Sequence, residues 1–172
     1  AYDQHWSTSP VAGSVAQLSW VERKLKRTLE MIEPQKLILG IPFYIRLWEE
    51  RTDESGRIKV SNPKALTMEE AQRLIQENNA DVKWDEESGQ FYAEYKSNGA
   101  LYKIWLEDEN SINLKSSLVH KYGLAGTAAW RRGSEVEEVW QVLNENLKNI
   151  ESYQQWKQKN SGNVYANNIS TG

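Results

Sequence analysis

Two short segments of the chain are almost continuously apolar. Residues 37–44 read LILGIPFY, and residues 124–130 read LAGTAAW. Runs of this length are too short for helices in the core, and they are typical of parallel strands that are buried on both faces. We therefore predict one parallel strand in each run.

Amphipathic segments of helical period accompany these strands. Ser19 and Glu22 form a capping box for a helix that Pro34 ends. A second helix is predicted over residues 111–122, and Ser134 with Glu137 is expected to cap a third. The inner face of that last helix is predicted to hold Val136, Val139, Trp140, Leu143, Leu147 and Ile150. Helices that alternate with buried strands indicate an α/β fold.

Residues 47–106 follow another pattern. Residues 51–63 are polar and rich in turn formers, and Thr67 with Glu70 forms a second capping box. Strand-like pieces follow at 82–84, 90–95 and 100–106, and short loops separate them. Because short loops join antiparallel strands, we predict a small antiparallel α+β insertion here.

The whole pattern predicts a strand, a helix, a strand, the insertion, a helix, a strand and a helix. If residues 1–3 end a further parallel strand, three such strands form the last third of a barrel. The expected divisions are 1–46, 47–106, 107–150 and a tail at 151–172 that is rich in Asn, Ser and Gly. We read that tail as a frayed end or linker.

Composition excludes several classes of site and partner. The chain of 172 residues has no cysteine, so disulfides, thiolate metal sites and a cysteine nucleophile are excluded. A net charge of −3 argues against a nucleic-acid partner. No apolar run approaches the length of a membrane span. His5 and His120 are far apart in the sequence, so we expect no metal site and no cofactor.

Aromatic composition points to sugars. The chain has eight Trp and eight Tyr but only two Phe. Trp and Tyr combine a flat apolar face with a polar edge, which suits the apolar face of a sugar ring. The alternative is that most of these rings belong to the core. Across the whole set, we expect one or two to line a surface or cleft.

The order of four motifs resembles the C-terminal part of glycoside hydrolase family 18, the chitinase-like barrel enzymes. YD at residues 2–3 is similar to the end of the family's sixth-strand motif. GIPFYIR at 40–46 resembles the seventh, and GTAAW at 126–130 the eighth. The family's α+β insertion follows the seventh strand. Together with YDQHW and IWLEDENSINLK, the motifs resemble the bacterial spore-cortex and cell-wall branch, over residues 1–150.

The resemblance implies roles for three residues at strand ends. Tyr2 would hydrogen-bond the acetamido oxygen of the substrate, and Asp3 would accept hydrogen bonds from sugar hydroxyls or the amide. Trp130 would be the floor on which the sugar stacks. The alternatives are a barrel-core tyrosine for Tyr2, a strand-end cap for Asp3 and a core position for Trp130.

Other candidates are less specific. Tyr44 and Arg46 would contact the sugar from the side, although the family usually has Gly where this chain has Ile45, and Arg46 could pair with a neighbouring carboxylate instead. We expect a structural or rim role for Glu107 and Asp108, because adjacent carboxylates on an extended segment point to opposite faces.

Five further aromatic or imidazole side chains are candidates by position. We expect one of the insertion's tryptophans to be a sugar platform, and the residues after the first strand also to face the cleft. These candidates are Trp48, Trp84 and Trp105, and His5 and Trp6.

The resemblance also implies what the parent protein does. It would cleave β-1,4 bonds next to N-acetylglucosamine, in peptidoglycan or chitin, outside the cell or in its envelope. The family's Asp-x-x-Asp-x-Asp-x-Glu motif is absent from this sequence, so the general-acid Glu is missing. We therefore expect a truncated, inactive piece of the enzyme, which self-associates through open sheet edges. The alternatives are a non-catalytic glycan-binding protein and a structural module of the cell envelope.

Overall fold

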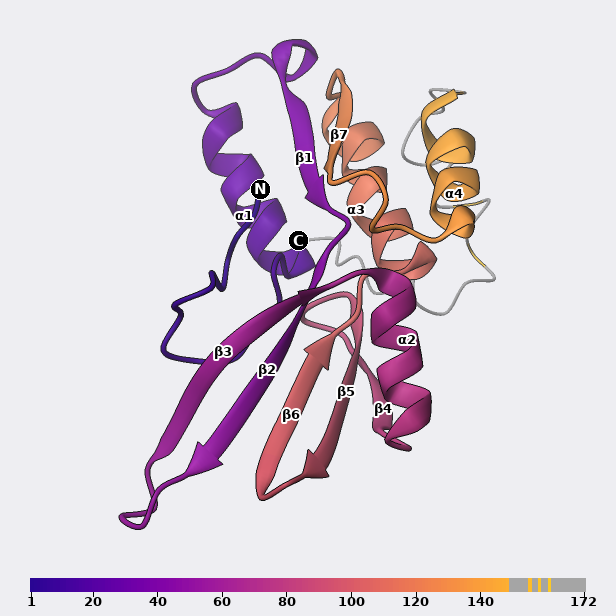
Figure 1. The fold of residues 1–172 in the computed structure, drawn as a ribbon. Helices are drawn as coiled ribbons and strands as arrows, with labels where there is room; N and C mark the ends of the chain where they lie inside the picture. Colours follow the sequence, from indigo (N-terminus) through magenta and orange to yellow (C-terminus); the bar gives the residue numbers. More distant parts are fainter. Residues whose placement is uncertain (149–154, 156–157, 159–160, 162–172) are drawn as a thin grey trace.

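The computed structural model describes residues 1–148, 155, 158 and 161 of the chain. The helices are α1 (Leu18–Leu29), α2 (Met68–Glu77), α3 (Glu109–Tyr122) and α4 (Glu137–Lys148), with a 3-10 turn at Pro34–Lys36. The strands are β1 (Ile38–Pro42), β2 (Ile45–Thr52), β3 (Ile58–Leu66), β4 (Asp81–Asp85), β5 (Gln90–Ser97), β6 (Ala100–Trp105) and β7 (Gly126–Trp130). Figure 1 shows two parts, with α1, α3, α4 and the short strands above and the larger sheet with α2 below.

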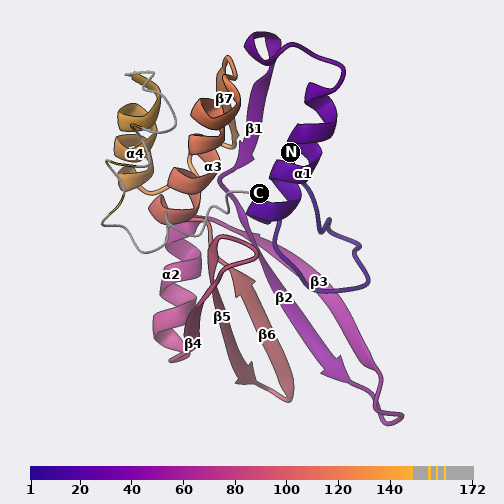
Figure 2. The same ribbon diagram turned by 180° about the vertical axis from the view of Figure 1, so that it is seen from behind.

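The upper part is built on a parallel pair of strands. β1 pairs with β7, from Ile38 opposite Gly126 to Pro42 opposite Trp130. α1 lies beside β1, and α3 and α4 lie beside β7 (Figure 2). The two apolar runs of the sequence therefore form neighbouring parallel strands, as predicted.

The predicted third parallel strand is not formed at residues 1–3, which have no strand conformation. The α-ammonium of Ala1 nevertheless donates to the carbonyl oxygen of Gly40 at 2.9 Å. The chain start thus lies along the free edge of β1. Burial lowers the pKa of this ammonium group.

The lower part is a five-stranded antiparallel sheet of order β3-β2-β6-β5-β4. The three strands predicted from residues 82–106 are present as β4, β5 and β6. The long hairpin of β2 and β3 was not predicted, because residues 51–63 are polar and one face of this hairpin is largely exposed to solvent. Ile58 and Val60 alternate with Arg57 and Lys59 and were the signal for β3.

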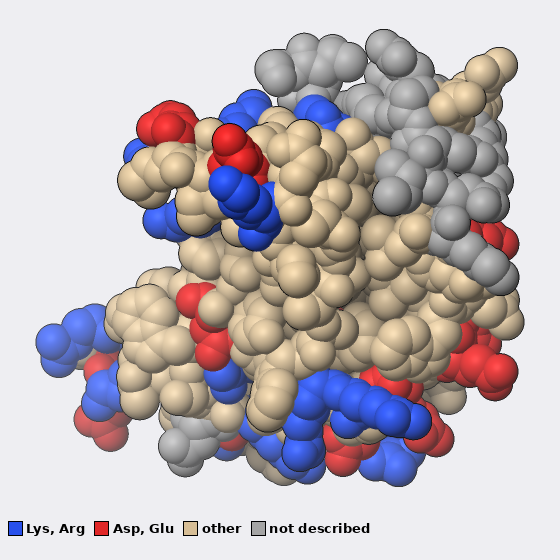
Figure 3. Space-filling view, turned by 90° about the horizontal axis from the view of Figure 1, so that it is seen from above, with Lys and Arg blue, Asp and Glu red and all other residues tan. Residues whose placement is uncertain are grey.

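A single apolar core runs through both parts. It contains Leu39 and Ile41 of β1, and it continues through Phe43 and Ile45 to Ile104 of β6. All five side chains are at most 4% exposed. The insertion is therefore packed onto the strands that carry it. Seen from above, the upper part is largely uncharged at its centre, and Lys and Arg side chains gather near the lower edge of the view (Figure 3).

The predicted capping boxes have different outcomes. The box at α2 is confirmed: the Thr67 side chain accepts from the Glu70 N–H, and the Glu70 carboxylate accepts from the Thr67 N–H. The prediction of a capping box at Ser19 is wrong. Gln17 precedes α1 without a side-chain cap, and the N–H groups of Leu18 and Ser19 donate to carbonyls of the loop before β5. Tertiary contacts thus replace the cap.

The last helix begins at Glu137, so Ser134 lies three residues before it. Val139 and Leu143 are buried as predicted, and Val136 and Leu147 pack against the core. Trp140 is 45% exposed, although its ring makes an edge contact with Phe43. Ile150 and the tail from residue 151 lie outside the described ranges, apart from residues 155, 158 and 161.

A buried ion pair joins the segment before α3 to the second turn of that helix. The Lys115 ammonium donates to a Glu107 carboxylate oxygen, and both side chains are at most 1% exposed. The same carboxylate accepts from Ser111 Oγ at 2.6 Å and from Gln90 Nε2 at 3.0 Å. Asp108 caps α3 by accepting from the Ser111 N–H. Both acidic residues therefore make structural contacts, and Glu107 does not lie on a rim.

Candidate functional site

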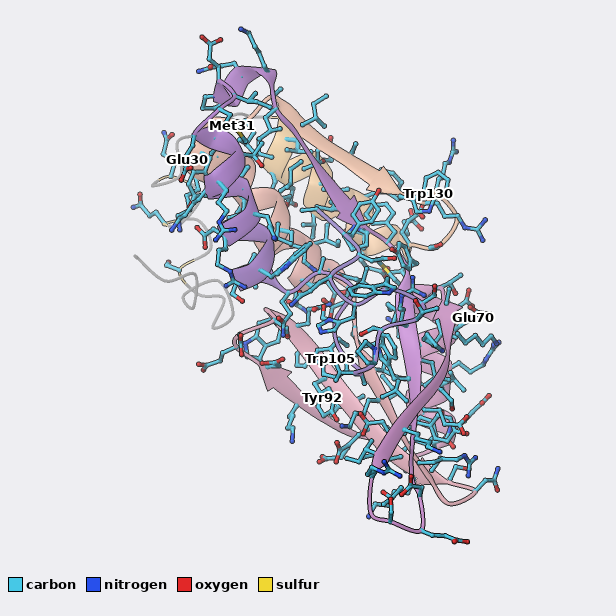
Figure 4. All side chains as sticks on the ribbon, turned by 90° about the vertical axis from the view of Figure 1, so that its left-hand side faces the viewer. Glu30, Met31, Glu70, Tyr92, Trp105 and Trp130 are labelled. Atoms are coloured by element: carbon cyan, nitrogen blue, oxygen red, sulfur yellow. The ribbon has the colours of Figure 1, made fainter. Side chains whose placement is uncertain are left out.

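A cavity of about 590 Å³ opens where β1 and β7 end. Its walls come from the start of the chain, the segment after each parallel strand, the end of β3 and the first turn of α2. Figure 4 shows Trp130 at the end of β7 and Glu70 at the start of α2 on the same side of the molecule. The residues around the cavity include Asp3, Tyr44, Arg46, Thr67, Glu70, Trp130, Arg131 and Ser134.

A hydrogen bond joins the two parts at this cavity. The N–H of Met68, the first residue of α2, donates to the carbonyl oxygen of Ser134 at 2.8 Å. The capping box fixes the same first turn of α2. The insertion therefore forms one wall of the cavity, and the ends of the parallel strands form another.

Asp3 is the centre of a charged hydrogen-bonded cluster. Its Oδ2 accepts from Arg46 Nη2 at 2.9 Å, and its Oδ1 accepts from the Tyr44 hydroxyl. The Asp3 side chain is 24% exposed and that of Arg46 is 11% exposed. The Arg46 guanidinium also lies over the Tyr44 ring, 5.6 Å from its centroid. Three of the predicted site residues are therefore in direct contact.

Ile45 stands where the family usually has Gly, but this difference does not turn Arg46 away from the cavity. Ile45 is fully buried, and successive residues of a strand point to opposite faces, so Arg46 points to the opposite side and reaches Asp3. The two carboxylates that follow Arg46 in the sequence, Glu49 and Glu50, are engaged elsewhere. Glu49 pairs with Arg51, and Glu50 pairs with Lys103.

Tyr44 is held as a hydrogen-bond donor. Burial raises the pKa of its hydroxyl strongly, and the hydrogen bond to Asp3 and the charge of that carboxylate add to the rise. Burial and the Asp3 charge also raise the pKa of Tyr2. Both phenols therefore keep their protons at every pH at which the protein would work.

Tyr2 stands next to this cluster but is not among the residues around the same cavity. Its ring meets that of Tyr44 edge-on, with centroids 6.2 Å apart. Tyr2 lines a second, apolar hollow of about 390 Å³ between α1 and β1, together with Trp20 and Gly40. Its side chain is 37% exposed.

Trp130 is the exposed aromatic ring of the site. It is 59% exposed although its backbone belongs to β7, and its carbonyl oxygen accepts from the Phe43 N–H at 2.7 Å. The strand thus fixes the backbone and leaves the indole at the cavity. The Tyr2–Asp3 and Trp130–Arg131 peptide bonds are both cis.

The segment after Asp3 is fastened to the scaffold by a series of hydrogen bonds. The Gln4 and Gln17 side chains bond each other at 2.6 Å, and His5 Nδ1 lies 2.7 Å from the Ser14 carbonyl oxygen. Trp48 Nε1 donates to the Gly13 carbonyl oxygen at 2.8 Å. His5 therefore has a structural contact.

The remaining aromatic candidates do not line this cavity. Trp6 is 51% exposed and donates from Nε1 to Thr8 Oγ1 at 2.9 Å. Trp48 is fully buried, and Trp84 packs against the core. Trp105 contacts the ring of Tyr92 on the insertion, and Figure 4 shows this pair well below Trp130.

Sequence analysis missed the contributions of Thr67, Glu70 and Arg131. The capping box located the first two on a helix, but no local signal placed that helix beside β7. Within the described part of the chain, no cluster of three His, Asp or Glu side chains is arranged to hold a metal. In the same part, no helix combines the length and hydropathy needed to cross a membrane.

Comparisons with known proteins agree on one family. Residues 1–135 match the model of the glycosyl hydrolases family 18. An uncharacterized glycosylase of Bacillus subtilis is 28% identical over 152 residues, which cover 86% of this chain and 41% of that protein. The cortical fragment-lytic enzyme of Bacillus anthracis is 25% identical, over 85% of this chain and 33% of the enzyme.

A solved structure agrees as well. The chitinase of Chromobacterium violaceum superposes with a TM-score of 0.74 at 27% identity, covering 86% of this chain and 44% of the chitinase. The chain therefore spans less than half of the length of each of these proteins.

Proposed function

The chain belongs to the glycosyl hydrolases family 18, and on that premise we propose that it supplies substrate-binding groups for the hydrolysis of β-1,4 bonds next to N-acetylglucosamine. The observation that carries this proposal is the Asp3–Tyr44–Arg46 cluster beside the exposed ring of Trp130. These groups meet where parallel strands end, which is where active sites form in barrels of this kind.

We propose a substrate-assisted reaction, which is a known exception to the two-carboxylate mechanism. The acetamido oxygen of the substrate attacks the anomeric carbon, and the bond from that carbon to the glycosidic oxygen breaks. A carboxylic acid gives its proton to the leaving oxygen. Water then opens the cyclic oxazolinium ion, and the configuration is retained.

The residues of this chain would orient the sugar for that reaction. Trp130 offers a flat face to the ring of the bound sugar. Tyr2 is proposed to donate to the acetamido oxygen, which would hold the internal nucleophile near its target. Asp3 retains acceptor capacity for a sugar amide or hydroxyl, and Tyr44 and Arg46 hold its carboxylate in place.

The proton donor is proposed to come from outside these 172 residues. The family's acidic motif is absent from the sequence, and the chain covers 41% of the first relative described above. We therefore expect the 172-residue chain to bind glycan without cleaving it. The same observation favours the second candidate, a non-catalytic glycan-binding protein.

The names of the relatives support a cell-wall setting. One relative is named for lysis of cortical fragments and one solved structure is a chitinase. We propose that the substrate is peptidoglycan or chitin and that the protein acts outside the cell or in its envelope.

The free edges of the β1–β7 pair are proposed to pair with another chain. Ile38 on β1 is 58% exposed, and parallel strands are normally covered on both faces. Sedimentation analysis of the 172-residue chain should show dimers or larger species. A monomer at every concentration would contradict this proposal.

The experiment that tests glycan binding is titration of the chain with chitotetraose, followed by calorimetry. We expect Trp130→Ala to weaken binding about five- to thirtyfold, because an aromatic–sugar stack contributes on the order of 1–2 kcal/mol. Trp6→Ala is the matched control, because Trp6 is 51% exposed but does not line the cavity. If neither the unsubstituted 172-residue chain nor its Trp6→Ala variant binds the sugar, the proposal fails and a structural module is favoured.

A further inference from the structure

Two consecutive arginines follow the stacking tryptophan. Arg131 lines the cavity, whereas Arg132 does not, and both side chains are exposed. Within residues 1–148, neither guanidinium makes an ion pair or a hydrogen bond. Figure 4 shows Trp130 at the end of β7, and both Trp130 and Arg131 line the cavity.

The carboxylates near these arginines are already bound to N–H groups. Glu135 accepts from the N–H of Gly133 at 2.7 Å and of Ser134 at 3.0 Å, and from Trp140 Nε1 at 3.0 Å. The structure thus gives this carboxylate three donors that are not arginine.

Glu70 is engaged in the same way. Its carboxylate accepts from the Thr67 N–H at 2.8 Å at the start of α2, and this hydrogen bond is the main reason that its pKa is lowered. The positive end of the helix dipole also lies there. The negative charge of Glu70 is therefore balanced by the helix it caps.

The second arginine of the cavity is balanced as well. Arg46 is ion-paired with Asp3 and is only 11% exposed. Of the four charged side chains around the cavity, Asp3 and Arg46 neutralise each other and Glu70 serves α2. Among the described side chains around the cavity, Arg131 is therefore the charged one that has neither an ionic partner nor a hydrogen bond.

We propose that Arg131 binds a carboxylate carried by the glycan, so that the site prefers an acidic N-acetylated glycan over a neutral one. This inference rests on the proposed glycan-binding function of the same cavity. A guanidinium offers paired N–H donors that match the two oxygens of a carboxylate. Chitin has no carboxylate. The alternate sugar of peptidoglycan carries a lactyl ether whose carboxyl group is either a free carboxylate or joined by an amide bond to a peptide, which then carries carboxylates of its own.

The test compares three probes on the 172-residue chain by calorimetry. The first is chitotetraose, the second is the peptidoglycan tetrasaccharide with free lactyl groups, and the third is the same tetrasaccharide with peptides on the lactyl groups. We expect the free-lactyl probe to bind about tenfold more tightly than chitotetraose, as one charge-assisted hydrogen bond would produce. If the peptide-bearing probe is preferred instead, the carboxylate that binds belongs to the peptide.

Two variants locate the effect. In Arg131→Gln the ratio of the two affinities should fall to about one, whereas Arg132→Gln should keep the ratio of the parent chain. The preference should also shrink as salt is raised, because the pair is at the surface. Circular dichroism confirms that both variants are folded.

The outcomes distinguish this inference from the proposed glycan binding on which it rests. If the acidic and neutral probes bind equally well to the parent chain, the assignment of Arg131 is wrong and glycan binding stands. If Arg132→Gln loses the preference and Arg131→Gln keeps it, the assignment is also wrong. If no probe binds, glycan binding fails and the inference fails with it.

Discussion

Replacing Lys115 with methionine removes the cation of a buried ion pair but keeps most of the side-chain volume. Lys115 is 0% exposed and Glu107 is 2% exposed. Without the ammonium, the Glu107 carboxylate keeps only two neutral donors, Ser111 Oγ at 2.6 Å and Gln90 Nε2 at 3.0 Å. A buried charge that loses its partner usually destabilises a protein by about 3–5 kcal/mol, and we expect a loss of that size at pH 7.

The loss should depend on pH, and its sign follows from the carboxyl group. Burial raises the pKa of Glu107, and the charge and hydrogen bond of Lys115 oppose that rise. Removing Lys115 therefore raises this pKa further. A carboxyl group whose pKa is higher in the folded than in the unfolded state destabilises the fold increasingly as pH rises between the two values. The deficit should thus shrink by up to about 1.4 kcal/mol per pH unit between pH 7 and pH 5.

Urea unfolding at pH 5, 6 and 7, followed by circular dichroism, measures this deficit. Glu107→Gln combined with Lys115→Met should recover much of the stability, because no buried charge remains. Lys36→Met is a surface control: its ion pair with Glu33 is 71% and 70% exposed, so it should change stability by less than about 0.5 kcal/mol. A Lys115→Met variant within 1 kcal/mol of the parent chain at every pH would refute the reasoning.

Three further substitutions test other contacts. Thr67→Ala removes the cap of α2 and should lower the free energy of unfolding by about 1 kcal/mol, measured as an earlier urea midpoint. Gly13→Ala would place Cβ 2.3 Å from Cε1 of His5, so we expect a loss of about 1–3 kcal/mol and a lower Tm; an unchanged Tm would contradict the close approach. Burial alone would raise the pKa of Glu22, but hydrogen bonding and charge from Lys121 lower it overall, so its stabilisation is present above its unfolded pKa and is lost as pH falls through the folded value. Glu22→Gln should therefore cost about 1 kcal/mol at pH 7 and nothing in acid, as a pH series of melts would show.

Much of the fold could be predicted where a local pattern decides the structure. The two apolar runs became β1 and β7, and the helical periods became α1, α2, α3 and α4. The hairpin of β2 and β3 was missed because many of its residues are polar and face solvent. The composition of this segment is therefore typical of a loop. The cap at Ser19 failed because the backbone carbonyls that satisfy the start of α1 come from residues 87 and 88, which are distant in the sequence.

The placement of the candidate residues could be predicted only in part. Motif resemblance singled out Tyr2, Asp3, Tyr44, Arg46 and Trp130. The structure brings the last four to one cavity, whereas Tyr2 lines the neighbouring hollow, and the roles of all five stay predictions. The proposed role of Arg131 could not be inferred from the sequence, because it depends on whether the nearby carboxylates of Glu70 and Glu135 already have hydrogen-bond partners. Those partners are known only from the three-dimensional structure.

The short junction between β1 and β2 has a consequence for redesign. β1 ends at Pro42 and β2 begins at Ile45, so only Phe43 and Tyr44 separate the barrel-type strand from the insertion. Phe43 is fully buried and its N–H donates to the Trp130 carbonyl oxygen, so this connection is tied to the core and to β7. By contrast, the turn at residues 53–57 lies at the far tip of the long hairpin (Figure 1). The hairpin lines the cavity at its other end, through Arg46, Ala65 and Leu66. A designer could therefore lengthen or shorten the tip, or attach a new segment there, while leaving the cavity wall as it is.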